Sequence, residues 1–235
     1  MKLTIPLVSK NIKVQPYNTS QEKDLILIPV YQEKIDDSCL DIALDICNIE
    51  QNIIDELSID EKKYLLYKLR EISVGTDINV KFQCSYCKTA NINSGDIKCE
   101  IIKPKKQSPY IIDLCTNPTQ ENIDKFFTNI DELDLDEYEE LKSNINDYIT
   151  SFKFELPIHC QKCGKINYID ITNTNFILKA MSTESIGSMY NTYTNLTYFG
   201  HYTKLDIDSM YPFERTFLIT NLNKLKEKEN ANIKQ

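Results

Sequence analysis

The sequence predicts an α+β fold in which helical segments at both ends flank a centre built from β-hairpins. Two observations carry this prediction. Apolar residues recur at helical spacing before residue 75 and again after residue 174, whereas in the strand-like stretches between them they alternate with a period of two. The 235 residues, 41% of them hydrophobic, are enough to bury a core. We therefore expect three regions: 1–75, an N-terminal strand plus helices; 76–173, the β region; and 174–235, a C-terminal helical hairpin.

The first region opens with two short apolar segments of β type, broken by Pro6 and Pro16, which predict an edge strand or hairpin within residues 1–16. Residues 20–34 then begin with a polar cap and an acidic first turn. Pro29 interrupts this segment, so it predicts a short or kinked helix.

Two further helical patterns complete the first region. Residues 37–57 place apolar side chains near helical spacing. Ser58 and Glu61 form a capping-box pattern at the start of the next helix, and this helix is expected to end near Ser73 because Gly75 supplies a C-cap.

The central region contains two similar units. Residues 77–83 and 151–159 both alternate as strands do, and each runs into a Cys-x-x-Cys pair. An offset of 76 positions aligns the two units and matches Cys84 with Cys160, Cys87 with Cys163, and Asn91 with Asn167. We interpret these units as two strand–knuckle–strand hairpins.

Two Cys-x-x-Cys knuckles together provide the four thiolates of a tetrahedral structural zinc site, so we expect one Zn²⁺ per chain in a zinc-ribbon-like centre. The eight cysteines lack a preceding signal-peptide pattern, which indicates a reducing compartment where paired thiols hold metal more often than disulfides. The alternative is that one pair is incidental and the other a free dithiol; a thioredoxin-like redox centre is disfavoured because neither pair precedes a clear helix. The expected metal ligands are Cys84, Cys87, Cys160 and Cys163.

The two knuckles are separated by 72 residues, so the segment at about 103–150 must be a module looped out from the ribbon. Such insertions are tolerated because loop closure costs only roughly 0.6 kcal/mol per doubling of length. Residues 131–140 hold seven acids in ten positions but lack the glycine and ligand spacing of an EF-hand, which favours a solvated charged face over a cation site or a site for a basic partner.

The remaining candidate residues are assigned structural roles. His159 precedes Cys160 on a strand and therefore faces the other way, and His201 is interpreted as a turn or packing histidine. No catalytic arrangement is evident, so we expect neither an enzyme nor a small-molecule substrate. The other cysteines are interpreted as small buried hydrophobes: Cys39, Cys47, Cys99 and Cys115.

The third region predicts two helices, at about 189–202 and from Pro212 onward, joined by a turn at 200–210. Tyrosines cluster on the first helix and just after it, at Tyr190, Tyr193, Tyr198 and Tyr202. Few basic residues interleave with them, which favours helix packing or a protein interface over a platform for stacking nucleic-acid bases.

The charge and hydropathy of the chain limit the kinds of partner it can bind. The net charge is −8, with 27 basic against 35 acidic residues, and only Arg70 and Arg215 are arginines, which disfavours nucleic acid as the main partner. Lysines at 103–106, with Lys81 and Lys88, keep a zinc-ribbon nucleic-acid-binding regulatory protein as the alternative function. The apolar runs are too short to span a bilayer, so no membrane association is expected.

Three segments resemble the T-even-type bacteriophage baseplate proteins, the hub assembly members above all. The segments are 3–28, 62–84 and 206–229; 103–150 carries no resemblance. The second contains Leu69, Arg70, Ser73, Val74 and Gly75, and the third contains Tyr211, Pro212, Glu214 and Arg215. The resemblance implies a non-enzymatic role in baseplate hub assembly, as an assembly factor (chaperone) or minor structural component. It also implies other tail and hub proteins as partners, and a location in the host cytoplasm during assembly or in the virion tail baseplate.

Overall fold

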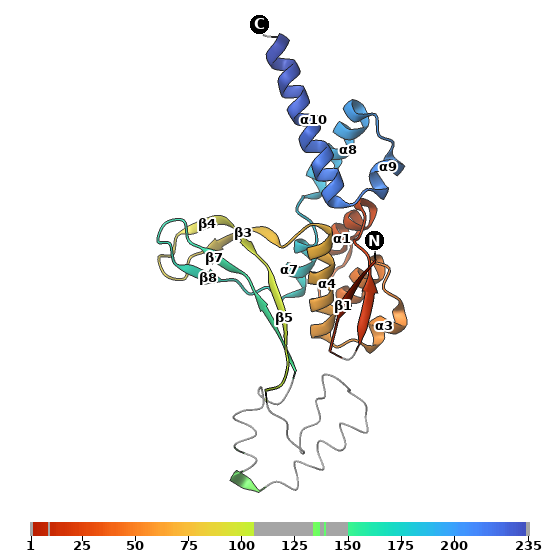
Figure 1. Cartoon of the computed structure of the whole chain (residues 1–235). Helices are drawn as coiled ribbons and strands as arrows, with labels where there is room; N and C mark the ends of the chain where they lie inside the picture. Colours follow the sequence, from red (N-terminus) through yellow and green to blue (C-terminus); the bar gives the residue numbers. More distant parts are fainter. Residues whose placement is uncertain (1, 9, 106–133, 137–138, 140–149, 234–235) are drawn as a thin grey trace.

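The computed structural model describes residues 2–8, 10–105, 134–136, 139 and 150–233 (Figure 1). This part of the chain mixes helices with small antiparallel sheets of two strands each, which confirms the mixed α and β character predicted from the sequence. Most of the predicted acidic insert, including Cys115 and most of the run at 131–140, lies outside the described residues.

The chain opens with the predicted hairpin, formed by β1 (Leu3–Pro6) and β2 (Asn11–Val14). The strands pair antiparallel, with Leu3 opposite Val14. Ile5, Ile12 and Val14 are buried and the residues between them are mostly exposed, so the hairpin covers the core with one face.

Five helices form the body behind this hairpin. They are α1 (Thr19–Tyr31), α2 (Ser38–Ile46), α3 (Gln51–Glu56), α4 (Ile59–Ser73) and α7 (Thr174–Ala180). The N-cap of α1 is Asn18, two residues before the polar cap predicted at Ser20, because Asn18 and Gln21 form a capping box. Pro29 lies inside this helix, which ends two residues later at Tyr31.

Helix α4 is the central helix of the core. Its capping box of Ser58 and Glu61 and its end at Ser73 are as predicted. Gly75 has a φ of +100°, and the N–H groups of Val74 and Gly75 both donate to the carbonyl of Arg70, which closes the helix C-terminus. Leu65, Leu66 and Leu69 of α4 are fully buried, against α2 and α7 among other elements.

A β-arm extends from this body (Figure 1). It consists of β3 (Asp77–Gln83), β4 (Ala90–Asp96), β7 (Pro157–His159) and β8 (Ile166–Tyr168). The pairs β3–β4 and β7–β8 are the two hairpins predicted from the sequence, and β4 lies beside β7. A side chain at Gly95 would come within 2.8 Å of the Pro157 carbonyl oxygen, so this contact between the hairpins needs glycine.

The β-arm is joined to the helices by a further strand pair, β5 (Lys98–Ile102) with β6 (Ser151–Glu155). This pairing was not predicted from the sequence. Residues 151–159 were predicted as one strand, whereas the structure has two strands there, separated by the buried Leu156. Phe152 and Phe154 of β6 pack against Tyr64 and Tyr67 of α4. Because Ile102 pairs with Ser151, the two ends of the insert lie side by side.

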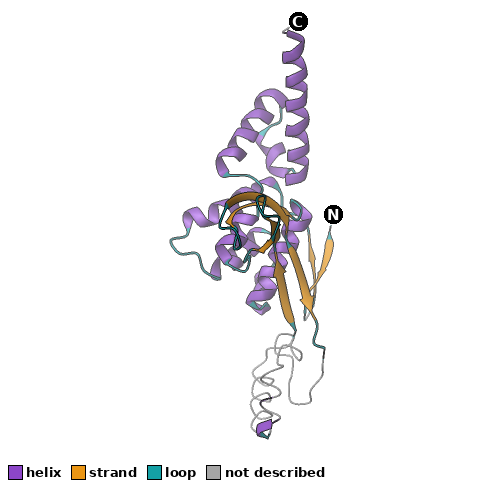
Figure 2. Ribbon diagram, turned by 90° about the vertical axis from the view of Figure 1, so that its left-hand side faces the viewer, coloured by secondary structure: helices purple, strands orange, loops and turns teal. Residues whose placement is uncertain are grey.

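The C-terminal part contains α8 (Ile186–Gly200), α9 (Lys204–Ser209) and α10 (Pro212–Ile233), and α10 projects away from the body (Figures 1 and 2). The segment at 200–210 was predicted as a simple turn, which is wrong: Thr203 and Asp206 form a capping box that starts α9. Helices α8 and α10 pack against each other. Within the described residues, every helix is too short or too polar to cross a bilayer.

Candidate metal centre

The ends of the two hairpins bring four cysteine sulfur atoms together. The Sγ atoms of Cys84, Cys87, Cys160 and Cys163 all lie within 4.8 Å of one another. The Sγ atoms of Cys84 and Cys163 are 3.7 Å apart, and those of Cys87 and Cys160 are 3.6 Å apart, and both of these contacts run between the hairpins. All four cysteines are free thiols.

Each pair of cysteines lies in a tight turn of the same design; we call residues 84–89 and 160–165 together the knuckle end. In the first turn the Lys88 N–H donates to the Cys84 carbonyl, and in the second the Gly164 N–H donates to the Cys160 carbonyl. Lys88 and Gly164 have φ values of +58° and +71°. This left-handed residue directly after the second cysteine reverses the chain, so that both thiols of a pair face the same side.

Two asparagines connect the turns to each other. The Gln161 N–H in the second turn donates to Asn91 Oδ1 on β4 at 3.0 Å, and the Ser85 N–H in the first turn donates to Asn167 Oδ1 on β8 at 2.9 Å. Asn167 Nδ2 also lies 3.6 Å from the Cys84 sulfur. Both asparagines are buried. Each hairpin therefore fixes the turn of the other.

The groups around the cysteines favour thiolate at two positions, Cys84 and Cys87, and hydrogen bonds with Thr89 lower the pKa of Cys87. Hydrogen bonds from the backbone N–H groups of Cys87 and Tyr86 lower the pKa of Cys84 to about 6. The backbone at Lys165 lowers the pKa of Cys163, but burial and the three neighbouring thiols outweigh it and raise this pKa to about 11. A cation among the four sulfur atoms would favour the thiolate form at each of them.

The donor set fits a tetrahedral metal ion. A metal–sulfur distance of about 2.3 Å in a regular tetrahedron requires sulfur atoms about 3.8 Å apart, close to the 3.6 Å and 3.7 Å contacts observed. The cysteines are therefore within range to hold a metal ion. Four protein ligands fill a tetrahedral coordination sphere and leave no position for water or substrate, so the arrangement is suited to holding the hairpins together and not to catalysis.

The other candidate residues lie elsewhere. His159 is exposed on β7, with its Nδ1 3.3 Å from the Gly164 carbonyl oxygen, and it is not part of the four-sulfur cluster. His201 is exposed and caps α8 in a left-handed conformation, as a turn histidine does. Cys39 and Cys47 are buried as predicted, and Cys99 is half-buried.

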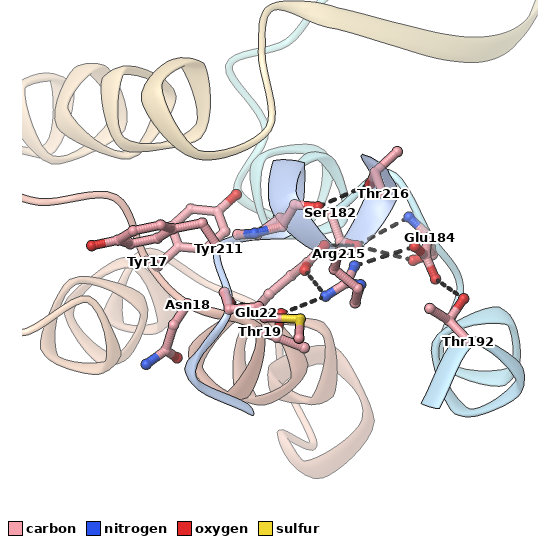
Figure 3. Close-up of polar contacts among 12 residues, drawn as sticks. Tyr17, Asn18, Thr19, Glu22, Ser182, Glu184, Thr192, Tyr211, Arg215 and Thr216 are labelled. Carbon is pink, nitrogen blue, oxygen red and sulfur yellow. Dashed lines mark hydrogen bonds and ion pairs between the residues drawn. The ribbon is translucent and has the colours of Figure 1, made fainter. Parts of the chain in front are cut away.

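A buried polar cluster was missed by sequence reasoning (Figure 3). Arg215 of α10 donates through Nη1 to Glu22 Oε2 at 2.7 Å and to Thr19 Oγ1 at 3.0 Å, both on α1. Its Nη2 donates to Glu184 Oε1 at 3.2 Å, and the Ser182 hydroxyl donates to the other oxygen of Glu22 at 2.5 Å. Arg215 and Glu22 are fully buried. Because the residues come from three distant segments, no local pattern in the sequence links them.

The cluster attaches the C-terminal helices to the N-terminal body. Burial alone lowers the pKa of Arg215, but the carboxylates of Glu22 and Glu184 outweigh this effect and raise its pKa above the ordinary value, so the guanidinium stays charged. Arg70, the other arginine of the chain, is also buried and donates to the carbonyls of Gly75, Asp77 and Ala180. Both arginines are thus occupied inside the protein and do not reach the surface to read nucleic-acid bases.

The chain is thus a mixed α and β protein whose distinguishing feature is a four-cysteine cluster suited to a metal ion. Residues 1–114 match the model of a family described as T4 bacteriophage base plate protein. This match covers just under half of the chain, so the N-terminal part of the chain is similar to the T4-type baseplate proteins. Neither a curated protein nor a solved structure matches the chain.

The match indicates a structural or assembly role in the phage tail, together with other tail proteins. Its residues include Cys84, Cys87 and Asn91, whereas Cys160, Cys163 and Asn167 follow its end. The family segment therefore contains half of the cluster, and the remainder of the chain supplies the other half.

Proposed function

We propose that the protein is a non-enzymatic phage tail protein that acts in assembly of the baseplate hub, as an assembly factor or as a minor structural component. The match of residues 1–114 to the baseplate family carries this proposal. Its partners are other tail and hub proteins, and it works in the host cytoplasm during assembly or in the tail baseplate of the virion.

We further propose that Cys84, Cys87, Cys160 and Cys163 hold one structural Zn²⁺ per chain in a zinc-ribbon-like centre. Zinc prefers four thiolates in a tetrahedron, and the sulfur spacing supports that geometry. A bound ion would supply a cross-link between hairpins whose knuckles are 72 residues apart in the sequence. We propose in addition that the chain is divided into three regions, 1–75, 76–173 and 174–235. The second region carries a looped-out acidic module at about 103–150.

The exposed surface of the C-terminal helices supports a role in binding other proteins. Tyr198, Phe213 and Phe217 are each more than half exposed. Large aromatic side chains in water are favourable contacts for a partner protein, because they bury much area and lose little side-chain entropy.

Native mass spectrometry of tagged protein purified from phage-producing cells tests both parts. We expect one zinc ion per chain and co-purifying tail or hub proteins. The Cys84→Ala/Cys160→Ala variant, prepared in parallel, is expected to lose the zinc. Zinc with nucleic acid and without tail proteins would replace the assembly role by nucleic-acid binding, and a metal-free chain would contradict the zinc site.

Proteomic analysis of purified mature particles then separates the two forms of the role. Presence of the chain in stoichiometric amounts identifies a structural component. Its absence from particles, combined with co-purification from cells, identifies an assembly factor that leaves after assembly.

A further inference from the structure

The distal part of the β-arm differs in charge from the rest of the chain. The chain has a net charge of −8, yet residues 78–95 and 156–169 contain no Asp or Glu. The same residues contain four lysines, all exposed: Lys81, Lys88, Lys162 and Lys165. Each lies within three residues of a cysteine of the cluster, so the lysines gather around the knuckle end.

The knuckle end lies away from the helical body (Figure 1). Apolar side chains are exposed on the same hairpins: Tyr86, Ile92 and Tyr168 are each at least 58% exposed. The Lys165 ammonium lies 4.6 Å from the centre of the Tyr86 ring, which holds one lysine beside an exposed aromatic surface. The two hairpins thus expose both positive charge and apolar side chains.

The lysines exceed what is needed to balance a bound ion. Four thiolates around one divalent cation carry a net charge of −2, whereas the four lysines carry +4. With such an ion bound, the cluster and the four lysines together would carry a net charge of +2, and the lysine side chains that carry the positive charge are exposed.

We propose that this surface, consisting of Lys81, Lys88, Lys162 and Lys165 with Tyr86, Ile92 and Tyr168, docks an acidic segment of another protein. Charge complementarity selects an acidic partner and speeds its encounter. The exposed tyrosines and isoleucine favour a polypeptide, because tyrosine is enriched in protein interfaces, and both arginines of the chain are buried elsewhere. The proposal depends on this charge distribution and not on the baseplate assignment.

Site-specific photo-crosslinking tests the proposal. A benzoylphenylalanine replaces Tyr168 in the full-length protein, phage-producing cells are irradiated, and the crosslinked peptide is mapped by mass spectrometry. We expect a peptide rich in Asp and Glu. The Lys88→Glu/Lys162→Glu/Lys165→Glu variant should reduce the crosslink to the level of unirradiated cells, while metal content and circular dichroism show that the variant is folded.

The matched control reverses three exposed lysines elsewhere, as Lys2→Glu/Lys13→Glu/Lys179→Glu, and should leave the crosslink unchanged. Replacing acids of the mapped peptide by lysine should restore the crosslink to the charge-reversed variant. A crosslink to nucleic acid, a crosslink insensitive to the lysine changes, or none at all overturns the docking surface. An acidic peptide from a host protein would uphold the surface and contradict the tail-protein partner, so the two proposals fail separately.

Discussion

Asn91 and Asn167 form reciprocal hydrogen bonds between the two hairpins: the side-chain oxygen of each accepts a backbone N–H from the cysteine turn of the other hairpin, at 3.0 Å and 2.9 Å. Their side-chain nitrogens donate to the carbonyls of Thr89 and Lys165 in their own turns. Each asparagine thereby joins the two turns. The pair positions the cysteines without touching a metal ion directly.

Replacing these asparagines is expected to weaken metal binding. Asn91→Ala and Asn167→Ala each remove a buried hydrogen-bond partner of a knuckle, and groups in such a supporting role typically change metal affinity by about 10- to 100-fold. Chelator competition with the purified protein measures this affinity. Asn79→Ala, at an exposed position of β3, is the control and should bind metal as the wild type does. Equal affinities for all three variants would show that the asparagines do not position the cysteines.

Removing the metal is expected to open the knuckle end. Binding free energy at such sites is folding free energy, so a zinc chelator, or the Cys84→Ala/Cys160→Ala variant, should lower the melting temperature. Amide hydrogen exchange should increase in β3, β4, β7 and β8 and much less in α4. Cys39→Ala, which changes a buried thiol outside the cluster, should keep the metal. A cysteine double variant that melts like the wild type would disprove the structural metal.

Breaking the buried ion pair is expected to destabilise the attachment of α10. Arg215→Ala leaves the carboxylate of Glu22 buried without its cation, and such changes cost about 3–5 kcal/mol of unfolding free energy. Urea denaturation measures the loss. Glu71→Ala removes a partly exposed pair with Lys68 and should cost less than about 1 kcal/mol. The Arg215→Met/Glu22→Met variant should recover part of the loss, and equal costs for Arg215→Ala and Glu71→Ala would contradict the cluster's role.

Alkaline pH is expected to destabilise the fold through Cys47. Burial raises the pKa of this thiol from 9.0 to about 12. The unfolded chain therefore releases the proton from about pH 9 while the folded chain retains it, so stability is fully present below pH 9 and declines as pH rises towards 12. The slope from one such group is about 1.4 kcal/mol per pH unit. Cys47→Ala should make the decline shallower, by about half this amount at pH 9 and by nearly all of it at pH 10.5, in urea denaturation, and identical slopes would contradict it.

Local features were predictable from the sequence because nearby residues determine them. The Ser58–Glu61 capping box, the N-terminal hairpin and the two cysteine hairpins all appear where their patterns indicated. The capping box of Thr203 and Asp206 carried a comparable signal that was overlooked, so α9 was interpreted as a turn.

Contacts between distant segments could not be derived in this way. Arg215 and Glu22 are 193 positions apart, and neither carries a local sign of its partner. The β5–β6 pair joins strands on the two sides of the insert, and Phe152 of β6 packs against Tyr64 of α4. The 76-residue offset pointed to Asn91 and Asn167 as equivalent positions, but their exchange of partners follows from the packing of β4 beside β7.

The burial of Arg70 and Arg215, the two arginines of the whole chain, makes an arginine-specific protease a selective reporter of conformation. The folded protein offers such an enzyme no accessible cleavage site, because cleavage requires the backbone to open locally first. A cut after Arg215 would release the last 20 residues and record loosening of α10, whereas a cut after Arg70 would record opening of the core helix α4. The relative amounts of the fragments cut after Arg215 and after Arg70 therefore show, in one digest, whether the C-terminal helices separate before the body unfolds.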